Sequence, residues 1–584
     1  MNEQRAPRRW SMDEGARRAW ARAWRPLATV LAALTLASCG GGGGEGVAPP
    51  LAPVTPTPPA AAAPTRAEAA RFLTQASFGP STADVDRVVA LGYAGWLDEQ
   101  FTAQQSLHLP AVPAYTDLLT PQFVGQFPLL QTWWTKAAVA PDQLRQRAAF
   151  ALSQIFVISM VDMNVIAYPQ GIASYMDMLG RNSFGNFRQL LEDVTLSPMM
   201  GLYLSHLGNM KEDPATGRLP DENYARELMQ LFTIGLVELN PDGTVKLDSR
   251  REPIETYTND DVIGLARVMT GWSWSAAAPD ATTFEPFRGF VLTDDRALKP
   301  MIAYPQFHSA SEKRFLGKTI AAGTGPQESL KQALDHLFNH PNVGPFIGRQ
   351  LIQRLVTSNP SPAYVGRVAA AFNDNGRGVR GDMQAVWRAI LLDPEARSAA
   401  QLNDPRFGKL REPVLRLTAW IRAFDVRSAS GSYQVFGTDD PSSGIGQAPY
   451  RSPSVFNFFR PGYVPPNTRA SAAGLVVPEM QIAGETSSSS YINFVGDMAV
   501  LGATGFLLDL RADYSAERQL ADNAQALVDR MDERLTYGTM SAQTKALMRE
   551  AIESVPITAF DARANRVRIA LLFTLSSPDF LVQR

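Results

Sequence analysis

The sequence predicts a mainly helical domain with little or no sheet and with long irregular loops. Apolar residues recur at helical spacing in many stretches, several of which begin at a capping residue and end at glycine or proline. Strand-like alternation is scarce, and neither a βαβ rhythm nor a fixed-period repeat is visible. We therefore expect one compact multi-helix domain over residues 65–584.

The first helix of this region shows the pattern most clearly. Thr65 followed three residues later by Glu68 is a capping box, and Gly79-Pro80 marks the stop. Further helices are predicted at 82–92, 96–101, 142–160, 185–196, 221–234, 259–270, 327–338, 343–356, 362–372, 380–392, 407–424, 490–502, 516–535, 542–553 and 561–575. Irregular segments are expected at 240–256, 273–306 and 429–478, and loops of this length often carry function.

The amino-terminal segment predicts a lipoprotein signal peptide at residues 1–38. A basic segment precedes the apolar run 27–38, which is too short to span a bilayer and ends in Leu-Ala-Ser-Cys. Cys39, the only cysteine of the chain, is therefore the expected lipidation site, with cleavage just before it. Translation starts at Met1 or Met12, and the sequence leaves both open.

Residues 39–64 follow the signal peptide as a tether. They are mostly glycine, proline, alanine and threonine, a composition that buries too little apolar surface to fold. A lipid followed by a tether predicts a cell-envelope protein that is attached to a membrane, its expected partner, through the lipid anchor. Gly40, rather than aspartate, follows the cysteine, which favours the outer membrane, at its periplasmic face or at the cell surface.

Composition narrows the function classes. A formal net charge of −2 provides no basic field, so we expect no nucleic-acid partner. With one cysteine, five histidines and no glycine-rich phosphate loop, no metal site and no cofactor are predicted. Thr258 to Asp261 is interpreted as a capping box rather than a calcium loop. His336 and His340 are interpreted as residues of a helix terminus rather than as metal ligands.

Several motifs, in order, resemble a bacterial family called domain of unknown function 1800. They are RFLTQASFGP (71–80), ENYARELMQLFTIG (222–235), YTNDDV (257–262), ARVMTGW (266–272), EKRFLG (312–317) and LSSPDF (575–580). The resemblance covers residues 65–584 and implies a shared fold and a secreted or envelope setting, but no established activity. Two departures, Phe232 in place of a frequent histidine and His308-Ser309 in place of His-Asp, weaken any metal or acid-base role at those positions.

The motif at 222–235 supplies the catalytic candidates. We expect a helix with Asp221 as its N-cap, on which Asn223, Tyr224 and Glu227 lie close together. In one interpretation, which we favour, Glu227 is structural and pairs with Arg267 or Arg147. In the other, Glu227 is a general acid or base, and Asn223 and Tyr224 orient a substrate.

The proline-rich segment within 429–478 supplies the ligand-binding candidates Phe456, Phe458, Phe459 and Tyr463, which could form a platform for a sugar or a peptide. Two functions follow. The first is a cell-surface or periplasmic binding or assembly protein for a polysaccharide or a secreted protein. The alternative is a hydrolase-like enzyme that uses Glu227. The absence of a recognisable nucleophile or metal set favours the first.

Overall fold

The computed structural model describes residues 63–114, 125–276, 287–289, 293–497 and 509–584. Within it, Pro64–Arg584 form one compact unit. The predicted signal peptide, the predicted lipidation site Cys39 and the tether up to residue 62 lie outside the described residues.

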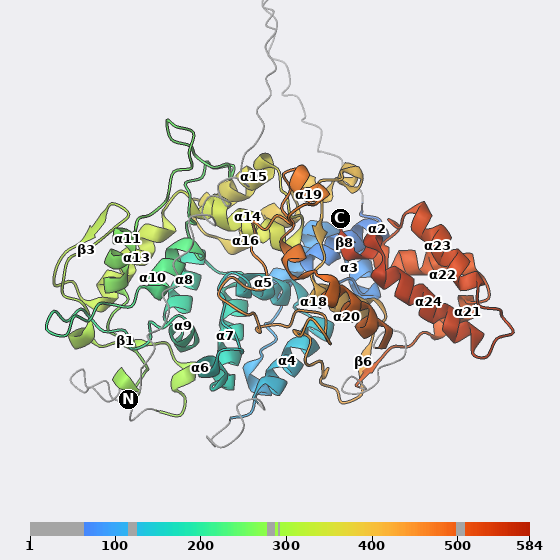
Figure 1. The fold of residues 1–584 in the computed structure, drawn as a ribbon, viewed down its shortest axis with the longest axis horizontal. Helices are drawn as coiled ribbons and strands as arrows, with labels where there is room; N and C mark the ends of the chain where they lie inside the picture. The colour runs from blue at the N-terminus through green and yellow to red at the C-terminus, as the bar shows by residue number, and fades with distance from the viewer. Residues whose placement is uncertain (1–62, 115–124, 277–286, 290–292, 498–508) are drawn as a thin grey trace, which may run out of the picture. The chain divides into compact units, whose positions relative to one another are not determined.

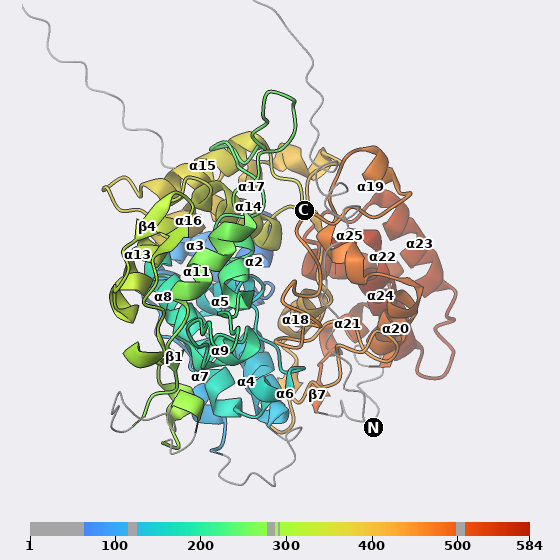
Figure 2. The same cartoon turned by 60° about the vertical axis from the view of Figure 1, so that its left-hand side comes forward.

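The described residues are mainly helical, which confirms the predicted fold class. Figures 1 and 2 show α21 to α24 gathered on one side of this unit, with α8, α10, α11 and α13 on the opposite side and α5 and α18 between them. The α-helices are α2 (Arg66–Ala76), α3 (Thr82–Thr102), α4 (Gln126–Val139), α5 (Gln143–Ser153), α6 (Met163–Ile166), α7 (Pro169–Asn182), α8 (Phe187–Thr195), α9 (Pro198–Tyr203), α10 (Asn223–Gln230), α11 (Asn259–Val268), α13 (Pro326–Phe338), α14 (Val343–Leu355), α15 (Pro362–Asn373), α16 (Met383–Leu391), α17 (Pro394–Arg397), α18 (Pro413–Ala423), α19 (Arg469–Ala472), α20 (Glu485–Val495), α21 (Ser515–Leu520), α22 (Ala524–Met531), α23 (Ala542–Glu553), α24 (Ala562–Ser576) and α25 (Pro578–Leu581).

The strands are short and form antiparallel pairs. They are β1 (Trp272–Ser273) with β2 (Ile302–Ala303), β3 (Lys313–Phe315) with β4 (Lys318–Ile320), β5 (Lys409–Leu410) with β8 (Val582–Gln583), and β6 (Arg427–Ser428) with β7 (Leu510–Arg511). The β5 to β8 pair joins segments distant in sequence, with Lys409 opposite Gln583. Among the helices of the described ranges, none has the length and apolar character needed to cross a membrane.

Local capping determines where several helices begin. The predicted capping boxes are formed at Thr65 with Glu68 and at Thr258 with Asp261, so the side chain of Asp261 is used as a cap and as an acceptor for the Leu316 N–H, 2.6 Å away. The predicted helices 82–92 and 96–101 are one continuous element, α3, kinked at Gly92, whose φ of 70° is left-handed.

Several predicted helices are shorter in the structure than in the sequence-based expectation, and the predicted helix 516–535 is divided into α21 and α22. Three of the differences have a clear local cause. α5 ends at Ser153 rather than at 160, because residues 154–162 turn away to contact the proline-rich loop. α10 begins at Asn223, and Asp221 is not its N-cap, because the residue at that position is Glu222. α18 begins at Pro413 because residues 409–410 pair with β8 instead of continuing the helix.

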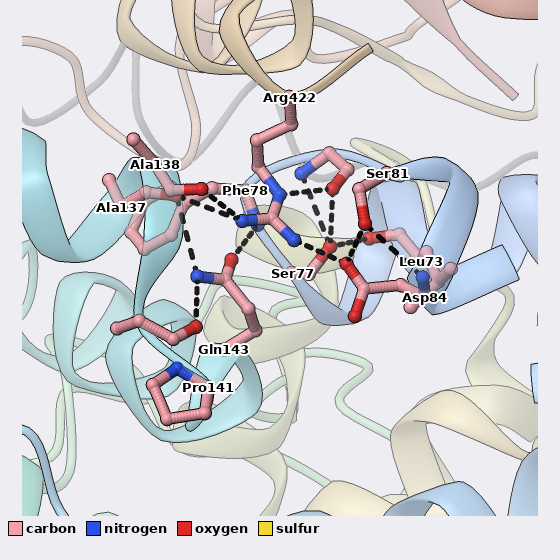
Figure 3. Close-up of polar contacts among 12 residues, drawn as sticks. Leu73, Ser77, Phe78, Ser81, Asp84, Ala137, Ala138, Pro141, Gln143 and Arg422 are labelled. Carbon is pink, nitrogen blue, oxygen red and sulfur yellow. Dashed lines mark hydrogen bonds and ion pairs between the residues drawn. The ribbon is translucent and has the colours of Figure 1, made fainter. Parts of the chain in front are cut away.

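A buried arginine, Arg422, connects three segments of the chain (Figure 3). Arg422 of α18 donates through Nε to the Gly79 carbonyl at 2.6 Å and through Nη1 to the Ala138 carbonyl at 2.5 Å. Its Nη2 forms an ion pair with Asp84 at the start of α3. We call Arg422, Gly79, Asp84 and Ala138 the Arg422 cluster. Because it joins α18 to the α2–α3 connection and to the last turn of α4, it fixes the packing of the amino-terminal helices.

Gly79 belongs to this cluster for a steric reason as well. Its φ is 126°, and a Cβ at this position would lie 2.8 Å from the Cα of Ala419 in α18. The glycine therefore permits both the turn after α2 and the close approach of the two helices.

We predict that Arg422→Met destabilises the protein by about 3 kcal/mol, because it removes the cationic partner of Asp84 and the guanidinium donors to the Gly79 and Ala138 carbonyls, so that Asp84 keeps only the Ser81 hydroxyl and Gly79 only the Ser77 hydroxyl. The measurement is urea unfolding at neutral pH followed by circular dichroism. Arg427→Met, at an exposed position of β6, is the matched control and is expected to change the free energy of unfolding by less than 0.5 kcal/mol, roughly the usual range for surface substitutions. Equal stabilities for the two variants would contradict the role of the cluster.

Candidate functional site

Tyr224 is a structural residue of α10. Its hydroxyl donates to Thr195 Oγ1 at 2.7 Å, and its ring stacks on the His206 imidazole with centroids 3.8 Å apart. His206 Nε2 lies 2.8 Å from the Thr195 carbonyl. Tyr224 and His206 therefore both contact Thr195, the last residue of α8, and hold α10 against α8. Because Tyr224 is fully buried, its hydroxyl is not available to orient a substrate.

Asn223 lies at the exposed start of the same helix. Its backbone N–H donates to Asp221 Oδ1 at 2.8 Å, and its side-chain amide reaches Ser205 Oγ at 3.4 Å. Ser205 in turn donates to Asp221 Oδ2 at 3.1 Å. Asp221 therefore acts as the acceptor of a local turn rather than as a helix cap, and Asn223 retains contact with solvent.

Glu227 is buried without a hydrogen-bonding partner on Oε2. The expected ion pairs are not formed, since Arg267 donates to the Glu312 carbonyl at 3.1 Å and Arg147 donates to the Arg354 carbonyl at 2.7 Å. Burial raises the pKa of Glu227 to about 7, although neighbouring Arg226 acts in the opposite direction.

The Tyr203 hydroxyl is a polar neighbour of Glu227. Burial, Asp162 and Glu227 together raise the pKa of the Tyr203 hydroxyl to about 12. A carboxyl group whose pKa lies near neutrality is present in both protonation states at physiological pH, which is the property required of a general acid or base. The pKa of Glu227 therefore supports the catalytic interpretation. The ion-pair interpretation is not supported, because Arg267 and Arg147 donate elsewhere.

The second candidate region is the proline-rich loop, residues 447–463. It is fixed to the segment after α5, because the Met160 N–H donates to the Tyr450 carbonyl and the Ser159 hydroxyl donates to the Ser452 carbonyl, both at 2.7 Å. Two residues of this loop have left-handed backbone, Tyr450 with φ 55° and Asn457 with φ 61°. Such conformations cost about 1 kcal/mol or more in a non-glycine residue, so the surrounding contacts hold this loop in place.

A small cavity opens between this loop and α5. It has room for about one water-sized group. Its lining is uncharged and is formed by Phe150, Ser153, Gln154, Ile158, Gln447, Ala448, Tyr450, Ser452, Asn457 and Phe458. Three lining side chains are more than nine-tenths buried and have an atom without a hydrogen-bond partner: Gln154 Oε1, Ser452 Oγ and Asn457 Nδ2. Each such atom costs about 1–3 kcal/mol when it is left unsatisfied.

The aromatic candidates of the loop have different environments. Phe458 lines the cavity, whereas Phe459 is only 5% exposed and packs inside the unit. The Arg460 guanidinium lies 4.7 Å from the centroid of the Phe456 ring. Tyr463 is partly buried, and its backbone pairs with Arg460 and Val477. Phe458 is thus the candidate that lies beside unpaired polar groups.

A fully buried charged group lies behind the cavity. The carboxylate of Glu412 accepts from Gln154 Nε2 at 2.5 Å and from Gln447 Nε2 at 2.9 Å. The ammonium of Lys409 lies 3.4 Å from Glu412 and 3.1 Å from Glu479. Burial raises the pKa of the Glu412 carboxyl, but Lys409 and other donors outweigh it, so that the pKa lies below its ordinary value and the group is ionised.

A family model described as a protein of unknown function, DUF1800, matches residues 71–582. The chain belongs to the DUF1800 family. Neither the curated proteins nor the solved structures yield a match to this chain.

The DUF1800 motifs have distinct structural roles in this chain. The first motif, 71–80, provides Gly79 to the Arg422 cluster, and Arg71 of the same motif donates to the carbonyl of the last residue, Arg584, at 3.3 Å. The motif at 222–235 provides Glu227. Gln154 and Ser452 lie outside the motifs recognised in the sequence, and so does Asn457, whose left-handed backbone has no reliable signature in a single sequence.

The described histidines and carboxylates of this DUF1800 protein are not arranged as a metal site. In the described ranges, no group of three or more His, Cys, Asp or Glu side chains has an arrangement that could hold a metal ion. His336 Nε2 lies 3.0 Å from the Leu316 carbonyl, and His340 Nδ1 accepts from the Asn342 N–H, so the pair does not cap the last carbonyls of α13 as the sequence suggested. His308 Nδ1 lies 2.8 Å from the Thr270 carbonyl, and burial lowers its pKa to about 4.

We predict that Glu227→Gln stabilises the protein above pH 7. The carboxyl has a folded-state pKa of about 7, compared with an ordinary value of 4.5. The free energy of unfolding is therefore highest below pH 4.5 and falls by about 3 kcal/mol as the pH rises from 4.5 through 7. The amide removes this loss. Thermal melts should show a midpoint about 3 °C higher for the variant at pH 8 and equal midpoints at pH 4.5.

Glu222→Gln on the same helix is the control, because Glu222 forms a partly exposed pair with Arg226 at 3.1 Å and should change the midpoint little at either pH. A lower midpoint for Glu227→Gln at pH 8 would show that Glu227 has a charged partner and would restore the purely structural interpretation.

Proposed function

We propose that this DUF1800 protein is a lipid-anchored protein of the bacterial cell envelope that binds a polysaccharide of the cell surface through the loop 447–463. The predicted lipidation at Cys39 and the tether 39–64 support the location, with the outer membrane as the expected membrane. A secreted protein is the other partner class compatible with this setting.

The observation that carries the binding proposal is the cavity beneath the loop. Uncharged groups without partners, Gln154 Oε1, Ser452 Oγ and Asn457 Nδ2, lie beside the aromatic ring of Phe458. A few converging polar groups next to an aromatic surface are typical of sites that bind small polar ligands such as sugar residues. The backbone contacts of this loop to residues 159–160 keep the groups in position without a ligand.

A second function is supported by Glu227. The unpaired carboxyl with a pKa of about 7 is suited to proton transfer, so a hydrolase-like activity is the alternative. No nucleophile adjoins Glu227 in the described contacts, and Tyr224 is committed to Thr195, so a reaction at this site would use water as the nucleophile.

We predict that Cys39→Ala abolishes membrane attachment. Without the thiol, no lipid can be added, and the tether has no apolar segment to replace it. Cell fractionation with immunoblotting should show the wild-type protein in the membrane pellet and the variant in the soluble fraction or as an unprocessed precursor. Ser38→Ala, which keeps a small residue before the cysteine, is the control and should leave processing intact. Cys39→Ala that is processed to the size of the wild-type protein and remains in the membrane pellet would contradict the anchor.

We also predict that the purified protein binds polysaccharide extracted from the envelope of the producing bacterium. Co-sedimentation and calorimetry are the measurements. If the protein is a binding protein, the polymer stays intact and Glu227→Gln binds as tightly as wild type. If it is a hydrolase, shorter fragments accumulate with wild type and not with Glu227→Gln. Failure of the protein to bind any envelope polysaccharide would exclude the binding proposal.

A further inference from the structure

We propose that the cavity beneath residues 450–458 is a sugar subsite. It binds one hydroxyl or hydroxymethyl group of a neutral glycan, and Gln154, Ser452 and Asn457 are its hydrogen-bonding residues. The inference rests on the proposed function, since it assigns the site and the ligand class of that binding activity.

The orientation of Gln154 is fixed by the charge behind it. Glu412, as an ionised carboxylate, can only accept hydrogen bonds, so the amide nitrogen of Gln154 faces it at 2.5 Å. The amide oxygen, Oε1, therefore points elsewhere, and it is buried without a donor. Gln447 has no such free atom, because its Nε2 also donates to Glu412 and its Oε1 accepts from the Val414 N–H at 3.2 Å. Gln154 thus offers the cavity one acceptor.

The loop supplies the complementary groups. Asn457 offers the donor Nδ2, and Ser452 offers a hydroxyl that can donate and accept, and neither atom has a partner in the structure. A ligand hydroxyl can donate to Gln154 Oε1 while it accepts from Asn457 Nδ2. A single hydroxyl group, like an ordered water, can therefore satisfy both types of unpaired atom, whereas an ion or a simple acceptor satisfies only one.

The size of the cavity limits what can enter. Room for about one water-sized group excludes a sugar ring and admits a hydroxyl or hydroxymethyl group. The ring would lie outside, against Phe458, which lines the cavity and is partly exposed. The C–H face of the sugar would pack against the Phe458 ring, and this contact supplies the apolar part of the binding.

The charge of the site favours a neutral ligand. No Lys, Arg, Asp or Glu side chain is among the residues that line the cavity. Behind Gln154 and Gln447, the Glu412 carboxylate is paired with Lys409, and the Arg354 guanidinium is held by the Gln154 carbonyl at 2.9 Å. An acidic sugar would therefore lose the hydration of its carboxylate without gaining a cation in the cavity. A peptide is disfavoured because residues 447–463 contain no strand with which an extended chain could pair.

The test uses the full lipidated protein in detergent and isothermal titration calorimetry. The probes are neutral glucans, galactans and mannans, each compared with the same polymer oxidised at its hydroxymethyl groups to carboxylates. We expect at least one neutral polymer to bind and its oxidised form to bind at least tenfold more weakly.

The variants locate the site. Ser452→Ala removes one unpaired hydroxyl with little change of shape, and Asn457→Gly removes the donor while it permits the left-handed backbone. Each should weaken binding of the neutral polymer at least tenfold, and Ser452→Val, which fills the cavity, should abolish it. Ser454→Ala, at an exposed position of the same loop, is the matched control and should bind as wild type does. Circular dichroism confirms the fold of each variant.

The outcomes separate the two proposals. If wild type binds envelope polysaccharide and Ser452→Ala binds equally well, the cavity assignment is overturned, as it would be if the cavity held only an ordered water, and the proposed function stands. Tighter binding of the oxidised polymers also overturns the assignment. If wild type binds no polysaccharide of any kind, both proposals fail.

Discussion

The hydrogen bonds of the buried Arg422 guanidinium are the interaction on which the packing of the amino-terminal half depends. This one side chain of α18 contacts the turn at Gly79, the start of α3 at Asp84 and the end of α4 at Ala138, all of which are far from α18 in sequence. The Gly79 carbonyl lies in the connection between α2 and α3, and the Ala138 carbonyl lies in the last turn of α4, so neither has an intrahelical donor. An arginine satisfies them because its donors fan out in one plane from a single buried point.

The same principle applies to other buried cations of the unit. Arg147, Arg354 and Lys409 are buried, and they donate to backbone carbonyls at or beyond helix ends; the Arg354 carbonyl, for example, accepts from both Arg147 and Lys409. A fold of many short helices has many such ends inside it, and long cationic side chains satisfy them. Glu227 Oε2 and the atoms of the loop cavity are among the buried polar atoms of the described residues that have no hydrogen-bond partner, and Arg147 Nε and Nη1 are others. A buried group of this kind requires an explanation, and a role in a functional site is one.

The sequence alone was sufficient for the fold class and for most helices. Capping boxes at Thr65 and Thr258 and the periodic apolar positions depend on neighbours within four residues, and such local interactions can be read without a structure. The family could also be recognised from the sequence, because the motif at 71–80 contains residues that the fold requires. Gly79, for example, is needed both for its left-handed backbone and for the absence of a side chain.

Tertiary structure decided everything about the candidate sites. Whether Glu227 is paired depends on where Arg267 and Arg147 point, and both donate to carbonyls elsewhere. The cavity is lined by Gln154, directly after α5, and Asn457 of the loop, about three hundred positions apart, and the sequence contains no local pattern that links them. The state of a buried polar atom depends on neighbours that only the folded chain brings within 3 Å or so, whereas a helix depends on residues already adjacent in sequence.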